Sequence, residues 1–440
     1  MPDIQNSSAD IRTIIDNRNL SGLQYATIFI CFLMNMLDGM DVLIISYTAP
    51  SIAAEWATNP EMLGVVFSAG LLGMTAGAMF LAPKTDVIGR KPMILLCAAI
   101  MGASIMATAY AQTITVLYIL RFISGLGIGA MLASTPALAS EYTPNRTKDF
   151  WVSLVISGYP MGAFLSGLVA AAVIPTYGWR TMYLVAGVAT FITIPLIYFL
   201  LSESLEFLFK TRPKNALERS NRILGKMGLD PLTHLPEVRT EKNIKAASIY
   251  SLLTADRKAA TLMLWTAFFM SFVTLYFLTS WIPKLAAITG LSLELAIYAA
   301  TVFNLGSFAG ILTQGYFSGK LGLRKVIGIF LIGAAVLMMT FGAFAGSALV
   351  LVLFGFIGFA IQGGFVGLYS VAARIYPTEV RTTGIGWAIG AGRIGALVGP
   401  LLGGVLIGME IPITLNFVIF AIPAIVAGIA TFMIRSTGVS

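Results

Sequence analysis

Long apolar segments separated by short polar stretches dominate the chain. A bilayer core about 30 Å thick needs about 20 apolar residues in a helix that rises about 1.5 Å per residue. Twelve segments of the 440-residue chain are long and apolar enough. The pattern predicts spanning helices near residues 24–46, 62–82, 93–111, 114–139, 150–173, 181–201, 258–283, 293–317, 326–346, 348–373, 383–407 and 411–434.

A longer polar stretch divides these segments into two sets of six, which predicts an all-α integral membrane protein of two six-helix bundles. The N-terminal segment 1–23 lacks the apolar core of a signal peptide, so we expect a cytosolic tail there. The expected domains are the tail 1–23, the first bundle 24–201, a cytosolic central loop 202–257, the second bundle 258–434 and a cytosolic tail 435–440.

Composition and charge agree with a membrane protein. Hydrophobic residues make up 57% of the chain and charged residues 11%, whereas a soluble surface needs roughly a quarter charged residues. Of the 28 lysines and arginines, 24 fall on one side of the predicted helices, and only Arg180 and Lys284 fall on the other. This bias predicts that both termini are cytoplasmic. It also explains the net charge of +8 without a nucleic-acid partner.

Several function classes lack the residues that they need. The two cysteines, Cys31 and Cys97, lie in apolar runs, and the one histidine, His234, lies in a polar loop. We therefore expect no metal site, no catalytic triad and no cofactor. No phosphate-binding Gly-x-x-x-x-Gly-Lys-Ser/Thr loop is present, which argues against an ATP-driven pump. An enzyme is not expected, and the longest polar stretch is too short for a receptor's signalling domain.

The two halves repeat at one constant offset. Four residue pairs are each 233 positions apart: Gly89 with Gly322, Gly125 with Gly358, Pro144 with Pro377, and Gly162 with Gly395. The offset holds from the second to the fifth span of each half. It predicts two pseudo-symmetric bundles with a solute site between them near the middle of the bilayer.

Several motifs resemble those of the major facilitator superfamily. The loop Asp86-x-x-Gly89-Arg90-Lys91 is similar to its signature between the second and third helices. The segment from Arg121 to Gly129 is similar to its helix-four motif, and Glu141-Tyr142-Thr143-Pro144 and Tyr376-Pro377-Thr378-Glu379-Val380-Arg381 resemble its paired loops. The resemblance covers nearly the whole chain and implies transport by alternating access, commonly by a monomer.

A narrower resemblance concerns the first helix. Leu37-Asp38-Gly39-Met40-Asp41 is similar to the Asp-Gly-x-Asp motif of aromatic acid:proton symporters. Members of that family import benzoate-type acids, hydroxybenzoates, protocatechuate, vanillate or muconate, which implies a multi-pass protein of a bacterial inner membrane. The chain departs from the superfamily pattern at Gly319, which stands where the first half has Asp86, and this suggests that the halves gate unequally.

Four charged residues fall inside predicted spans: Asp38, Asp41, Arg121 and Arg393. Each costs about 2.5–3.5 kcal/mol at a helix centre unless it has a partner or a water-filled cavity. Asp38 and Asp41 share one helix face, and Asn35 lies one turn earlier. Two acids so close in a low dielectric resist being ionised together, which favours a proton carrier. The alternative is a static ion pair that locks two helices.

Helix geometry offers Asp38 a partner. Asp38 lies about 21 Å from the inner face, in a helix that runs outward. Arg121 lies about 11 Å from the outer face of a layer about 30 Å thick, in a helix that runs inward. Their heights differ by a few ångströms, so an Asp38–Arg121 pair that exchanges on protonation is possible. The resemblance also ties the helix-four arginine to proton coupling. A static salt bridge is the alternative.

Arg393 is expected near mid-depth, where a guanidinium suits a carboxylate. We therefore predict that it binds the substrate anion, although packing against carbonyl groups or a first-half acid is the alternative. Other side chains could stack on a substrate ring or hydrogen-bond to it, although aromatic residues also form interface belts. These candidates are Tyr276, Trp281, Tyr369, Trp387, Asn304 and Gln362.

The cytosolic loops are expected to form a gate. By resemblance, Asp86 would brace the start of the eleventh helix, beside the turn at Gly89 and Arg90. Glu141, Arg146 and Arg381 would add ion pairs. Alternatively, the basic residues only set the orientation of the chain in the membrane and form no gate.

The sequence thus predicts a symporter that imports a small, aromatic or aromatic-derived carboxylate with a proton. Two buried acids beside two buried arginines favour an anion over a neutral sugar. The alternatives are a transporter of another organic anion such as a sugar acid, and a sugar-type or drug-type facilitator or exporter.

Overall fold

Helices account for nearly all of the structure, which is a computed structural model. It describes residues 15–16, 18–236, 252–254, 257–345, 347–376 and 378–434. Within these ranges, the side chains of residues 133, 149, 373, 378, 379, 381 and 382 are not described. The first half contains α2 (Gly22–Trp56), α3 (Pro60–Ala76), η1 (Gly77–Leu81), η2 (Ala82–Lys84), α4 (Thr85–Ile88), α5 (Arg90–Thr108), α6 (Ile114–Tyr142), η3 (Asn145–Thr147), α7 (Lys148–Tyr177) and α8 (Trp179–Leu200). The second half contains α11 (Lys258–Ile288), α12 (Leu293–Leu321), α13 (Leu323–Met339), α14 (Phe341–Phe344), α15 (Leu349–Ile375), α16 (Thr378–Gly408) and α17 (Ile413–Met433). Between the halves lie α9 (Leu205–Thr211) and α10 (Ala216–Lys226).

Eleven helical segments of the described residues are long and apolar enough to cross a membrane. The twelfth predicted span, 326–346, is divided between α13, which has 17 residues, and the short α14. A helix of this length lies at the lower limit for spanning. The predicted all-helical membrane fold is therefore confirmed, with one span that is shorter than the pattern indicated.

Local sequence explains where several helices begin. Ser21 caps α2 in a capping box with Gln24, and Asn59 caps α3 just before Pro60. Gly89 and Gly322, which correspond to each other in the repeat, separate successive helices with φ of 100° and 92°. Positive φ is easy only for glycine, so the repeated turn needs this residue in both halves.

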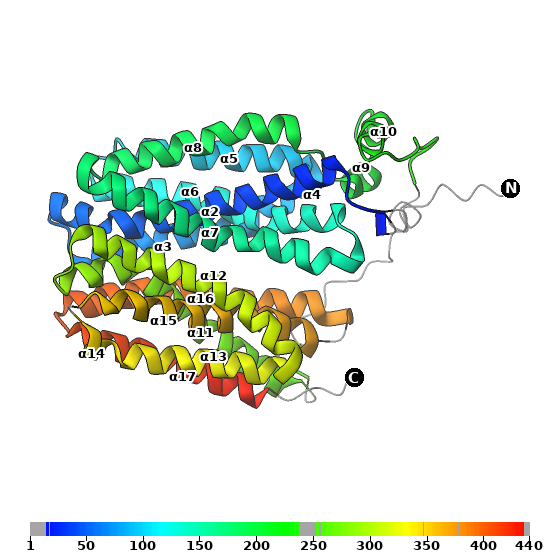
Figure 1. The fold of residues 1–440 in the computed structure, drawn as a ribbon. Coiled ribbons are helices and arrows are strands. Elements are labelled where there is room, and N and C mark those ends of the chain that lie inside the picture. Colours follow the sequence, from blue (N-terminus) through cyan, green and yellow to red (C-terminus); the bar gives the residue numbers. More distant parts are fainter. Residues whose placement is uncertain are drawn as a thin grey trace.

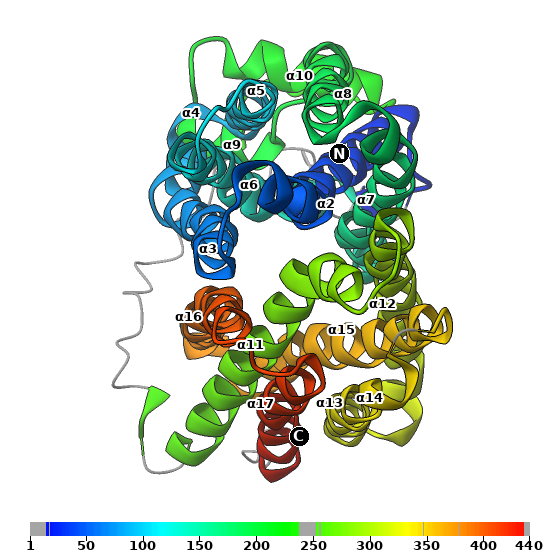
Figure 2. The ribbon, with the colours of Figure 1, turned by 90° about the vertical axis from the view of Figure 1, so that its left-hand side faces the viewer.

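The helices form two bundles that lie side by side (Figure 1). In the view of Figure 2, α2, α3, α5, α6, α7 and α8 form the upper bundle, and α11, α12, α13, α15, α16 and α17 form the lower one. We call the end at which α2 begins, α17 ends and α9 and α10 lie the terminal end, and the opposite end the far end (Figure 1).

The repeat is visible in the helix contacts. A Cβ atom on Gly162 of α7 would clash with the carbonyl oxygen of Met36 in α2. A Cβ atom on Gly395 of α16 would clash in the same way with the carbonyl oxygen of Phe269 in α11. Both contacting residues are shifted by the repeat offset, so α7 packs on α2 as α16 packs on α11. Small residues allow such close backbone approach between membrane helices.

The halves contact each other mainly through α3 with α16, α7 with α12 and α2 with α11. Ser68 Oγ donates to the carbonyl oxygen of Leu397 at 3.0 Å, and Ser46 Oγ donates to that of Ser280 at 2.9 Å. Nearer the far end, a Cβ atom on Gly404 of α16 would lie 2.7 Å from the carbonyl oxygen of Pro60 in α3. These described contacts close the gap between the halves from mid-depth to the far end.

Candidate functional site

Asp41 and Arg121 form a buried ion pair between α2 and α6. Arg121 Nη1 contacts Asp41 Oδ1, and Nη2 donates to the Asp41 carbonyl oxygen at 2.8 Å. Ser124, one turn after Arg121, donates to Asp41 Oδ2. Asp41 is fully buried and Arg121 is 3% exposed. A buried pair repays its desolvation only with such additional hydrogen bonds, so this cluster is a well-satisfied junction.

Asp38 lies one turn before Asp41 in α2 and differs from it in surroundings. It is fully buried, and neither carboxylate oxygen has a hydrogen-bond partner among the described residues. An ionised carboxylate without a partner is costly to bury. Among the described residues, no group supplies the compensation that an ionised Asp38 would need.

The predicted Asp38–Arg121 pair is wrong for this structure, because Arg121 pairs with Asp41 instead. The depth estimate could not separate two acids that lie so close together in one helix. Asn35 also lies in α2, where its Nδ2 donates to Thr135 Oγ1 of α6 at 2.9 Å and to the Cys31 carbonyl oxygen at 2.9 Å. Its amide N–H groups thus link α2 to α6.

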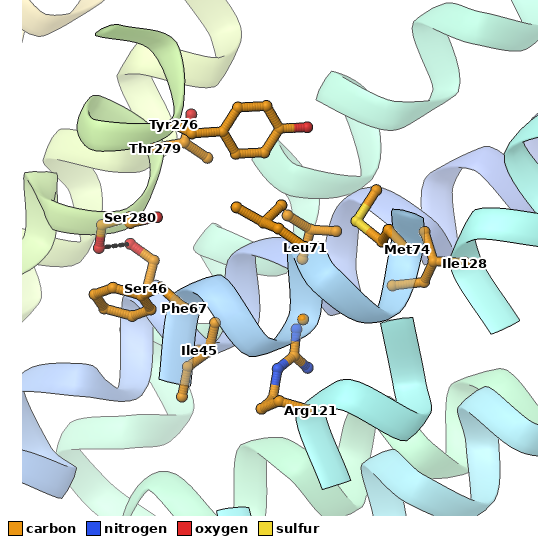
Figure 3. A pocket seen from close by; sticks show the side chains of 12 residues that line it. Ile45, Ser46, Phe67, Leu71, Met74, Arg121, Ile128, Tyr276, Thr279 and Ser280 are labelled. Atoms are coloured by element: carbon orange, nitrogen blue, oxygen red, sulfur yellow. Dashed lines mark hydrogen bonds between the residues drawn. The ribbon is translucent and has the colours of Figure 1, made fainter. Parts of the chain in front are cut away.

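A small cavity lies between the halves beside this cluster (Figure 3). Arg121 of α6 borders it from one side, and Tyr276 and Ser280 of α11 border it from another, together with Gly70 and Leu71 of α3. The cavity has a volume of about 20 Å³, which is room for a single water molecule. Entry of any larger solute requires the halves to move.

Arg393 lies in the middle of α16 and is half-buried. The hydroxyl groups of Tyr159, Tyr276 and Tyr369 lie within electrostatic range of its guanidinium group. Tyr276 stacks on Phe272 with ring centroids 5.6 Å apart, and Tyr369 packs edge-on against Phe268 at 5.2 Å. The positive charge of Arg393 therefore acts on tyrosine hydroxyl groups from α7, α11 and α15.

The other predicted substrate residues lie in different surroundings. Trp281 is fully buried, donates from Nε1 to the Pro400 carbonyl oxygen at 3.0 Å and packs edge-on against Phe67 of α3. Asn304 is 5% exposed and donates to the Ala300 carbonyl oxygen. Trp387 is 48% exposed and stacks on Trp265. Gln362 is half-buried in α15.

A second cluster holds the terminal end of the first half together. Glu203 Oε1, from the segment after α8, accepts hydrogen bonds from the backbone N–H groups of Arg90 at 2.8 Å and Lys91 at 3.2 Å. Glu141 contacts Arg90 Nη2 at 2.7 Å and accepts a hydrogen bond from Ser204 at 2.5 Å. A carboxylate at the N-terminus of α5 is favourable, so Glu203 anchors the glycine turn before this helix.

Two other predicted gate residues, Asp86 and Arg146, are more exposed. The side chain of Asp86 is exposed in α4, and its carbonyl oxygen accepts from Thr211 Oγ1 at 3.4 Å. Arg146 is exposed in η3. Arg381 lies in α16, but its side chain is outside the described part of the chain.

Sequence reasoning missed three residues at these sites: Ser124, Tyr159 and Glu203. Ser124 stands one turn after Arg121 within the helix-four motif, so the spacing of the motif could have pointed to it. Tyr159 directly precedes Pro160 in α7, and no local pattern separates it from other tyrosines. Glu203 belongs to a Glu-Ser pair after the sixth span, which carried no contact information by itself.

Comparison with known proteins places the chain in a family. The family model described as Major Facilitator Superfamily matches residues 31–313 and 264–439. A 4-hydroxybenzoate transporter of Acinetobacter baylyi is 33% identical over 98% of this chain and 95% of its own length. A benzoate transport protein of the same organism is 30% identical over 97% of this chain and 92% of its own length. A gallate transporter of Pseudomonas putida is 30% identical over 96% of this chain and 94% of its own length.

Solved structures support the fold. A partially occluded inward-open xylose transporter from E. coli has a TM-score of 0.75 and 18% identity, covering 96% of this chain and all of its own. A bacterial homologue of the lysosomal transporter Spinster, in an inward-facing conformation, has a TM-score of 0.71 and 14% identity over 95% of this chain and 98% of its own. At such identities the likeness concerns the fold alone.

Proposed function

The chain belongs to the major facilitator superfamily, and from this premise we propose that it imports a small aromatic carboxylate together with a proton by alternating access. Family membership makes it a transporter and not an enzyme. The observation that carries the proposal is Asp38, a fully buried carboxyl group with no hydrogen-bond partner among the described residues.

The proton binds at Asp38. A carboxyl group at mid-membrane is expensive in its ionised form, and a bound proton removes that cost. The neighbouring Asp41 is already engaged by Arg121 and Ser124, so its charge is balanced within the protein. The two acids therefore have separate tasks: Asp41 joins α2 to α6, and Asp38 takes up and releases the proton.

The substrate carboxylate binds at Arg393. The guanidinium group matches a carboxylate in geometry and charge, and the rings of Tyr276 and Tyr369 offer surfaces for an aromatic ring. Relatives at 30% identity or more are named as transporters of 4-hydroxybenzoate, gallate and benzoate, which supports this substrate class. Asp38 in the first half and Arg393 in the second would thus bind proton and anion on opposite sides of the interface.

The topology gives the orientation in which the halves would alternate. The excess of lysine and arginine supports a cytoplasmic terminal end. We further propose that the protein acts as a monomer in a bacterial inner membrane. The contacts of α3 with α16 then seal the outside, and the structure corresponds to a state closed to the exterior. Movement of the halves about the midplane would open the far end and admit proton and substrate.

Uptake in proteoliposomes tests the proposal. Labelled benzoate, 4-hydroxybenzoate, protocatechuate and muconate are supplied with and without an inward proton gradient. We expect at least one acid to accumulate only with the gradient, and Arg393→Ala to lose uptake while Arg374→Ala, an exposed arginine in α15, keeps it.

Gradient-independent equilibration of the acids would contradict symport. Failure to transport any of the four would contradict the aromatic substrate class and favour a sugar acid or an export role.

A further inference from the structure

A group of basic side chains gathers at the terminal end of the first half. Lys91, at the start of α5, and Arg219 of α10 both contact Glu203, and the charge of Lys226, two turns after Arg219 in α10, also acts on Lys91. We call these three residues the Lys91 cluster. Lys91 Nζ donates to the carbonyl oxygen of Tyr198 at 2.6 Å and lies 5.3 Å from the centroid of its ring.

The cluster carries more positive than negative charge. Glu203 is the acid that faces it, with Oε2 3.8 Å from Arg219 Nη2. The other oxygen of Glu203 is already engaged by backbone N–H groups at the start of α5. Among the charges that act on Lys91, Glu203 is the one anion beside the two cations Arg219 and Lys226, so a further anion would relieve the repulsion among the three basic groups.

The position of α10 is fixed by packing. Ala216, Ser220, Ile223 and Leu224 form its buried face. Asn221 exchanges two hydrogen bonds with the backbone of Leu232, at 2.9 and 2.7 Å. Lys226 remains exposed. Packing thus fixes α10, and Arg219 on this helix reaches Glu203 in the segment after α8.

The cluster lies beside a lipid-facing surface. Tyr198 and Phe199, at the last turn of α8, are 60% and 74% exposed and pack edge-on with ring centroids 5.1 Å apart. Ile192, farther from this end of α8, is 61% exposed. Exposed aromatic rings at the end of a spanning helix are typical of the level of lipid headgroups.

We propose that the Lys91 cluster binds the phosphate headgroup of an anionic phospholipid, whose acyl chains lie along the exposed face of α8. A basic group next to a membrane surface attracts anionic lipid, with about 1 kcal/mol for each lysine or arginine. The combination of unbalanced cations with an adjoining apolar helix face favours a lipid over a free anion. The site is separate from Asp38 and Arg393 and does not depend on the proposed substrate.

The second half offers a natural contrast. Arg324 corresponds to Lys91 in the repeat. It donates to the carbonyl oxygen of Ile434 just after α17, and Lys91 donates in the same way to the carbonyl oxygen of Tyr198 at the end of α8. In the described part of the second half, no helix corresponds to α10. Lys325, which is exposed beside Arg324, therefore provides a matched control.

Native mass spectrometry of the full-length protein tests the site. The protein is released from detergent with equal amounts of phosphatidylglycerol and phosphatidylethanolamine that carry the same acyl chains. We expect preferential retention of phosphatidylglycerol by the unchanged protein. Lys226→Gln should weaken this retention about five-fold, Lys226→Glu should weaken it further, and Lys325→Glu should leave it unchanged.

Four outcomes would overturn the proposal. The first is equal retention of the two lipids by the unchanged protein. The second is an equal loss with Lys325→Glu, which would indicate a general charge effect. The third is displacement of the lipid by millimolar inorganic phosphate, which would assign the cluster to a soluble anion. Thermal unfolding of each variant reports on folding separately, and a folded Lys226→Glu protein that retains the lipid fully also contradicts the site.

Discussion

Asp38 and Asp41 occupy one face of α2, but their surroundings give them different properties. Asp41 is neutralised by Arg121 and accepts a hydrogen bond from Ser124, whereas Asp38 is fully buried without a partner among the described residues. The residue type alone does not separate an anchor from a proton site. The neighbours on α6 decide it, because they reach Asp41 and not Asp38.

Removing one member of the Asp41–Arg121 pair should destabilise the protein more than removing both. Arg121→Met leaves a buried, unpaired Asp41, at a cost of about 3–5 kcal/mol. The double variant Asp41→Leu with Arg121→Met leaves no unpaired charge and should recover most of that loss. Thermal unfolding in detergent measures both. A double variant that is less stable than Arg121→Met would contradict the buried pair.

Glu203 should matter for the stability of the terminal end. Glu203→Gln removes the charge at the N-terminus of α5 and should lower the free energy of unfolding by about 1 kcal/mol. Glu206→Gln, an exposed acid in the first turn of α9, is the matched control and should have little effect. Chemical unfolding of the two variants checks this, and equal effects would argue against the anchor.

At this scale the sequence predicted the chemistry better than the pairing. It identified Asp38, Asp41 and Arg121 as buried charges because ionisable residues in apolar runs are conspicuous. It paired Arg121 with the wrong acid because one helical turn rises only about 5.4 Å, within the error of a depth estimate. It missed Glu203 because the contact with α5 depends on how the chain folds back after α8.

Among the helices, backbone contacts at glycine determine which pairs pack closely. Gly395→Ala should lower thermal stability by about 1–3 kcal/mol, because its Cβ atom would clash with the backbone of Phe269. Gly390→Ala, on the same helix, has no atom within 4 Å of the added Cβ. It should be neutral or stabilising by up to about 1 kcal/mol. Unfolding midpoints compare the two, and a destabilised Gly390→Ala with an unaffected Gly395→Ala would contradict the packing.

The constant offset between the halves was the strongest guide to the arrangement of these helices. It related Gly162 to Gly395 before any contact was known, and both residues support the same close approach in their halves. The pattern did not reveal η1, a π-helical turn from Gly77 to Leu81, or the end of α13 at Met339. Hydropathy averages over whole turns, so it does not register such local changes.

For the molecule as a whole, closure of the far end depends on small residues between α3 and α16. Gly404→Val should hold the halves apart there, because its Cβ atom would lie 2.7 Å from the Pro60 carbonyl oxygen. In a Ser46→Cys background, the new thiol borders the central cavity and should then react faster with an impermeant thiol reagent added at the far end. Gly386→Val, where an added Cβ has open space, is the control. Cys31 and Cys97 are buried and give a low background.

Unchanged labelling in Gly404→Val would contradict closure through the α3–α16 contact. Faster labelling in Gly386→Val as well would point to a general loosening of α16.

Proton movement coupled to substrate tests the central claim most directly. In proteoliposomes with equal pH on both sides, addition of a transported acid outside should draw protons inward, and a trapped pH-sensitive dye should report acidification. In Asp38→Asn the same acid should still exchange across the membrane, but without a pH change. Acidification that persists in Asp38→Asn, or exchange in the unchanged protein without any acidification, would contradict the assignment of Asp38 as the proton site.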